Sequence, residues 1–104
     1  MKYDVIIIGA GPGGIFSAYE LMKKRPDLTV AVFEEGHRLE ERHCPIDGER
    51  VKSCVNCPTC AIMNGFGGAG AFSDGKYNIT NDFGGTLYEY IGRKEALELM
   101  RYVD

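Results

Sequence analysis

The sequence lacks any long hydrophobic segment, and its strongest apolar run, Val5 to Ile8, is bounded closely by Asp4 and Gly9. That run is far shorter than a signal-peptide core or a membrane span, so we expect a cytoplasmic protein with no membrane partner. A basic stripe is also missing, because the net charge is −3 and charges of both signs are interspersed. Nucleic acid is therefore not an expected partner.

Low-complexity linkers, internal repeats and a disorder signature are absent as well. The 104 residues are 44% hydrophobic and 26% charged, which fits one small folded domain. Glycine and cysteine, in contrast, are concentrated. Many of the 14 glycines gather in residues 9–14 and 65–75, and the four cysteines all lie between Cys44 and Cys60. Two glycine-rich loops indicate two close approaches of backbone to a ligand.

The first 36 residues are predicted to form a β–α–β unit. Residues 3–8 are an apolar, β-branched run, typical of a strand buried on both faces of a parallel sheet, and residues 28–33 are a second β-branched run. Residues 13–25 between them place apolar side chains at helical spacing, and Pro12 suits a first helical turn. We therefore predict the α/β class and a Rossmann-like FAD/NAD(P)-binding domain, the N-terminal part of a doubly wound parallel sheet.

Residues 9–14, Gly-Ala-Gly-Pro-Gly-Gly, satisfy the dinucleotide-binding pattern G-x-G-x-x-G at the predicted strand–helix junction. In this pattern Gly9 allows a tight turn, Gly11 a close approach of pyrophosphate and Gly14 close packing of the helix. The pyrophosphate would meet the free N–H groups of the helix N-terminus. The alternative is an unrelated glycine turn. The predicted cofactor-binding residues of this part are Gly9, Gly11, Pro12, Gly13, Gly14, Glu34 and Glu35.

Glu34 ends the second predicted strand, twenty positions after Gly14. An acid at this point accepts hydrogen bonds from ribose hydroxyls, and its charge repels a 2′-phosphate. FAD or NAD is therefore favoured over NADP. Glu35 is a possible substitute one position further on.

Residues 4–14, DVIIIGAGPGG, and 30–36, VAVFEEG, resemble the N-terminus of the two-dinucleotide-binding-domain flavoproteins, the glutathione-reductase-like superfamily. Residues 65–76, GFGGAGAFSDGK, are similar to a branch of FAD-dependent dehydrogenases within it. The resemblance implies FAD in the first loop and a flavin-dependent oxidoreductase that serves a small-molecule substrate or electron carrier. It also implies that residues 65–76 run past the FAD pyrophosphate towards the flavin ring.

The second glycine loop can present several backbone N–H groups to an acceptor, and its small side chains leave room for a ring. Lys76 either holds negative charge on reduced flavin or is merely solvated. No catalytic residue is assigned, and a non-catalytic nucleotide- or metal-binding module is the alternative function. The predicted cofactor-binding residues of this loop are Gly67, Gly68, Ala69, Gly70 and Ser73.

The cysteines of residues 54–60 form a C-x-x-C-x-x-C run. Three thiolates at this spacing can wrap one metal or cluster, with Cys44 as a fourth ligand. Zinc and a [4Fe–4S] cluster are both open, although the run lacks the further cysteine that follows in ferredoxins. The same spacing also allows a redox-active dithiol or ordinary reduced cysteines in a loop. The candidate metal ligands are Cys44, Cys54, Cys57 and Cys60.

Residues 37–62 have no sustained period and are predicted to be a Cys-rich insertion. Residues 63–104 hold the second glycine loop, a short strand at 77–80 and helices at 86–91 and 93–103. The last helix has no capping signal, so catalytic residues are expected beyond residue 104 in a longer protein. A half-built sheet leaves apolar strand faces uncovered, so this piece is expected to form a homo-oligomer and to hold FAD weakly or not at all.

Overall fold

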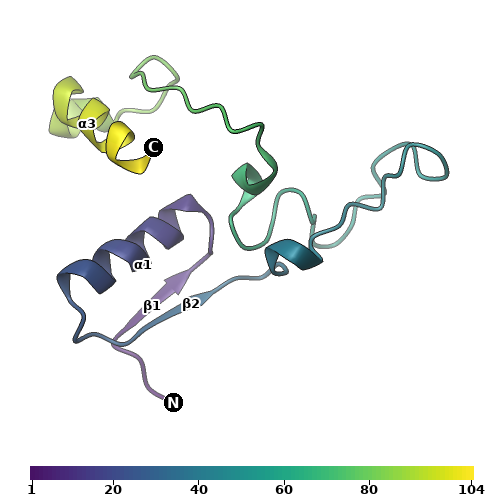
Figure 1. Cartoon of the computed structure of the whole chain (residues 1–104), viewed down its shortest axis with the longest axis horizontal. Coiled ribbons are helices and arrows are strands. Elements are labelled where there is room, and N and C mark those ends of the chain that lie inside the picture. The colour runs from purple at the N-terminus through teal and green to yellow at the C-terminus, as the bar shows by residue number, and fades with distance from the viewer. The chain divides into compact units, whose positions relative to one another are not determined.

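The computed structural model describes residues 1–104 and divides into two compact units, Met1–Ser73 and Asp74–Asp104 (Figure 1). The first holds strands β1 (Val5–Ile8) and β2 (Val30–Phe33), helix α1 (Pro12–Lys24) and the 3-10 turns η1 (Leu39–Glu41) and η2 (Ala69–Phe72). The second holds helices α2 (Leu87–Ile91) and α3 (Arg93–Val103).

The predicted β–α–β unit is present, with boundaries shifted by one or two residues. β1 and β2 pair in parallel, from Val5 beside Val30 to Ile8 beside Phe33, and α1 connects them and packs on the sheet (Figure 1). This α/β arrangement is compatible with the start of a Rossmann-like domain. Two strands do not make the doubly wound sheet, which stays a prediction.

Only one face of the sheet is covered, which agrees with the expectation that a half-built sheet leaves apolar strand faces exposed. Ile7 is half-buried, whereas Ile6 and Ile8 on the opposite face are 57% and 81% exposed. The physical reason is that α1, the one α-helix of Met1–Ser73, can cover only one face of the sheet. An apolar sequence thus reports that a strand can be buried, not what covers it.

Gly14 lets α1 approach β1 closely, as its place in the glycine pattern predicts. A Cβ atom on Gly14 would overlap the carbonyl oxygen of Gly9 and lie 3.3 Å from Cγ2 of Ile7. Gly13, the preceding residue of the same helix, has open space where its Cβ would stand. Pro12 is the first residue of the helix, as predicted, and the N-cap residue Gly11 gives no side-chain cap.

We predict that Gly14→Ala lowers the free energy of unfolding by about 1–3 kcal/mol, because the backbone of the turn must move to admit a methyl group. The control is Gly13→Ala, which should be neutral or stabilise by up to about 1 kcal/mol through the better helix propensity of alanine. Urea unfolding followed by circular dichroism measures both. Equal losses in the two variants would contradict the close-packing role of Gly14.

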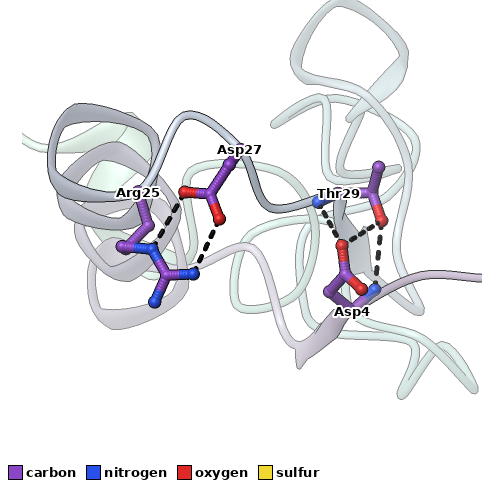
Figure 2. Close-up of polar contacts among 4 residues, drawn as sticks. All are labelled: Asp4, Arg25, Asp27 and Thr29. Carbon is purple, nitrogen blue, oxygen red and sulfur yellow. Dashed lines mark hydrogen bonds and ion pairs between the residues drawn. The ribbon is translucent and has the colours of Figure 1, made fainter.

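The two strands are tied together at the end opposite the glycine turn by Asp4 and Thr29 (Figure 2). Asp4 Oδ2 accepts hydrogen bonds from the Thr29 backbone N–H at 2.8 Å and from its hydroxyl at 2.9 Å. These bonds hold the pKa of Asp4 below its ordinary value. Beside them Arg25 donates two hydrogen bonds to Asp27, at 2.9 and 2.7 Å, within the turn that leads into β2 (Figure 2).

In the second unit, α2 and α3 meet at Gly92 and pack on one another around the fully buried Ala96. Both helices were predicted, α3 with the same bounds. The strand predicted at residues 77–80 is wrong, because this stretch has no regular structure and no strand of its unit lies beside it to accept backbone hydrogen bonds. No helix of the structure has both the length and the apolar character that crossing a membrane requires.

Candidate functional site

A cleft of about 390 Å³ opens at the carboxyl ends of β1 and β2. In open α/β sheets ligands bind at this end of the strands, and volumes of a few hundred Å³ are usual for small-molecule sites. Three stretches of the first unit line it. They are the end of β1 with the first glycine loop (Ile8, Gly9, Gly11), the end of β2 with the following acids (Phe33, Glu34, Glu35), and the start of the second glycine loop (Met63, Asn64, Gly65, Gly68).

The two glycine loops contact one another at the edge of this cleft. Gly67 N–H donates a hydrogen bond of 2.8 Å to the carbonyl oxygen of Ala10, a residue with no exposed surface. A Cβ on Gly68 would lie 3.2 Å from both Cα of Gly11 and Cδ of Pro12. Only glycine therefore fits at position 68 without displacing the first loop, and this close contact was not predicted.

Some of the predicted site residues line the cleft, whereas others lie in the loops and the helix around it. Gly9, Gly11, Glu34, Glu35 and Gly68 line the cleft. The others do not: Gly14 packs against β1, Gly67 bonds to Ala10, and Ala69 and Gly70 form the 3-10 turn η2 that ends before Ser73. Pro12 and Gly13 form the first turn of α1. Lys76 pairs with Asp74 at 3.4 Å and is 83% exposed.

Glu34 connects the first loop to the chain after β2. Its Oε2 accepts a hydrogen bond of 2.7 Å from Ala10 N–H, and its Oε1 accepts one of 3.0 Å from Gly36 N–H. These two backbone donors hold the pKa of Glu34 below its ordinary value, so the carboxylate is charged at neutral pH. A carboxylate has about four acceptor sites, so Glu34 keeps capacity to accept a hydroxyl group.

Arg42 is the functional residue that sequence reasoning missed. Its side chain is 3% exposed. The guanidinium donates to four backbone carbonyls and stacks on the ring of Phe72, with 4.8 Å between the guanidinium carbon and the ring centroid. Two of the accepting carbonyls, those of Phe66 (2.9 Å) and Gly68 (2.9 Å), lie in the second glycine loop. The other two, those of Ala61 (2.8 Å) and Ile62 (2.7 Å), lie at the end of the Cys-rich segment before it.

The packing around Arg42 also depends on glycine. A Cβ on Gly65 would lie 2.6 Å from Cδ of Arg42, and a Cβ on Gly36 would lie 2.6 Å from Cα of Gly65. Phe66 N–H donates a 3.0 Å hydrogen bond to His37 O in the same region. Arg42 thus fixes the second glycine loop against residues 36–42. In the sequence it stands in a charged stretch beside the exposed Arg38, with no pattern to tell the two apart.

We predict that Arg42→Lys lowers the free energy of unfolding by about 2–4 kcal/mol, since one ammonium group cannot bond four carbonyls in the geometry of a guanidinium. Arg38→Lys, in the same segment but exposed, should change it by less than about 0.5 kcal/mol. Denaturant unfolding gives these values, and hydrogen exchange at Phe66 and Gly67 reports the loop. Unchanged exchange at both amides in Arg42→Lys would contradict the role assigned to this side chain.

The four cysteines gather at a second pocket of about 210 Å³. All are free thiols. No three His, Cys, Asp or Glu side chains lie close enough together to hold a single metal ion, so the predicted metal site stays a prediction. Backbone N–H groups of Met63 and Ile62, with a smaller effect of the Arg42 charge, hold the pKa of Cys60 below its ordinary value.

Comparison with known proteins places similarity in the β–α–β unit. Residues 1–39 match the model of the Thi4 family. Thiamine thiazole synthase of Yarrowia lipolytica is 58% identical over 33 residues, which are 32% of this chain and 10% of that protein. The enzymes of the same name from Eremothecium gossypii and Candida albicans SC5314 are each 55% identical over 31 residues, 30% of this chain and 9% of theirs. No solved structure matches the chain.

The chain thus spans about a tenth of the length of the curated relatives that it matches. The family match covers β1, α1, β2 and Glu34, and it ends before Arg42, the cysteines and the second glycine loop. These matches support a β–α–β unit of the kind found in Thi4-family proteins. They do not test the resemblance to the glutathione-reductase-like flavoproteins, which stays a prediction.

Proposed function

We propose that the cleft between the two glycine loops binds FAD, and that this chain is the N-terminal part of a flavin-dependent oxidoreductase of the dehydrogenase type. The observation that carries the proposal is the hydrogen bond from Gly67 N–H to Ala10 O, which joins the two glycine loops at one cleft. A lone glycine turn would serve many nucleotides. Two loops at the carboxyl ends of the strands match the longer ligand that the sequence resemblance implies.

The chemistry of the cleft fits a dinucleotide. α1 has 13 residues and begins next to the cleft, after its N-cap residue Gly11, with no side-chain cap, so the positive end of its dipole would attract a pyrophosphate. Glu34 supplies an anionic acceptor for ribose hydroxyls and repels a 2′-phosphate. Gly65 and Gly68 line the same cleft as the first loop, so a ligand bound there would contact both loops.

The name of the relatives gives a second candidate, thiamine thiazole synthase. Its support is the identity within residues 1–39, which contain the first glycine loop and Glu34. The two candidates therefore share this half of the cleft. We favour the oxidoreductase because the second loop, which touches the first one, lies outside the match and resembles the FAD-dependent dehydrogenases.

We predict that Glu34→Gln weakens FAD binding about tenfold or more, since a charged acceptor for the ribose hydroxyls is lost. Glu35→Gln, one position further along the same cleft, is the matched control and should weaken binding less than about threefold. Fluorescence titration of the full chain with FAD measures both. Inorganic pyrophosphate, which has no ribose, should bind both variants as it binds the unaltered chain.

Equal losses of FAD affinity in the two variants would contradict the assignment of Glu34 to the ribose. A loss of pyrophosphate binding in Glu34→Gln would show instead that this side chain serves only to brace Ala10. The absorption spectrum separates the wider candidate functions. A yellow full-length protein with flavin bands supports the proposal, whereas a colourless one that contains zinc supports a non-catalytic module.

A further inference from the structure

The pocket lined by Cys44, Cys54, Cys57 and Cys60 is built by a chain reversal between the first and second of them. Asp47 makes this turn. Its Oδ1 accepts hydrogen bonds of 2.8–2.9 Å from the backbone N–H groups of three residues further on, Glu49, Arg50 and Val51. The reversal returns the chain so that thiols ten or more positions apart face one space of about 210 Å³. The remaining walls include the apolar side chains of Pro45, Ile46, Val55 and Ala61.

One of the sulfur atoms already accepts a backbone hydrogen bond. Asn56 N–H donates to Cys54 Sγ at 3.4 Å, and Asn56 has φ +53, the one positive φ outside glycine. The local backbone is thus turned towards this sulfur, as in loops whose cysteines bind a cluster.

The number of thiols around one pocket indicates the class of occupant. No three of the cysteines are close enough together to hold a single metal ion as they stand, although all four line the same pocket. Four cysteine thiolates are the usual ligand set of a [4Fe–4S] cluster, which is larger than a single zinc ion.

We propose that Cys44, Cys54, Cys57 and Cys60 ligate a [4Fe–4S] cluster, one thiolate to each iron. Cys44 supplies the ligand that the run of residues 54–60 lacks, and it does so from before the run rather than after it. Cys54 and Cys57 are exposed and Cys44 and Cys60 are half-buried, so the cluster can enter from solvent and be covered on one side.

The cluster would adjoin the candidate FAD cleft through one short segment. Cys60 O accepts a 2.8 Å hydrogen bond from Asn64 N–H, and Asn64 lines the cleft. The carbonyls of Ala61 and Ile62 between them are bound by Arg42. The cluster, which carries single electrons, would thus lie beside the proposed FAD, which accepts two. Cluster binding itself is tested without FAD, so it stands or falls independently of the proposed function.

The test is anaerobic incubation of the full chain with iron(II), iron(III) and sulfide, followed by removal of unbound ions. We expect about four iron and four acid-labile sulfide per chain, with the electron paramagnetic resonance signal of a [4Fe–4S] cluster after reduction. Serine in place of any one cysteine should lower bound iron at least about fivefold, because three ligands hold the cluster poorly. Thr59→Ala and Ser53→Ala, in the same loop, should retain it.

Three results would overturn the proposal. They are a chain that takes up zinc but no iron with sulfide, a chain whose thiols pair as a disulfide and hold no cluster, and a Cys44→Ser variant that keeps four iron. Helical circular dichroism separates a lost ligand from a lost fold in the serine variants. The iron and sulfide content of the unaltered chain decides the matter even where a variant fails to fold.

Discussion

The guanidinium of Arg42 is the contact on which the site depends. The second glycine loop has few side chains of its own to pack, so its order must come from backbone hydrogen bonds. From one buried charge, Arg42 supplies two of them, to Phe66 and Gly68, and two more to the segment that leads into the loop. If water replaced these hydrogen bonds, the loop would lose its fixed conformation, and the wall of the candidate cleft that Gly65 and Gly68 form would be lost.

Glycine and the charged residues act together around this contact. Gly36, Gly65 and Gly68 each stand where a side chain would meet backbone or Arg42, so the loops can approach closely. Glu34 then fixes the first loop through Ala10 N–H. A carboxylate and a guanidinium thus hold the two loops, each through backbone groups rather than through one another. The proposed FAD site and the proposed cluster site both adjoin the segment that Arg42 binds.

The sequence predicted those features that depend on residues close together in the chain. The β–α–β unit and the packing of Gly14 follow from hydrophobic spacing and from the glycine pattern, and α3 was predicted with its observed bounds. Arg42 could not be predicted, because its partners are backbone carbonyls about twenty residues away that carry no sequence signal. The strand predicted at residues 77–80 was wrong for a related reason, since a strand forms only beside a partner strand and this stretch has none. The gathering of Cys44 with the later cysteines depends on the turn at Asp47.

The most direct test of the central claim is an amide NMR titration of the full chain with FAD. If both glycine loops form one binding site, the signals of Gly11 and Gly13 in the first loop and of Gly65 and Gly68 in the second should shift together. They should also follow a single dissociation constant. Shifts confined to the first loop would contradict the claim, since the second loop would then be packing beside the site rather than part of it.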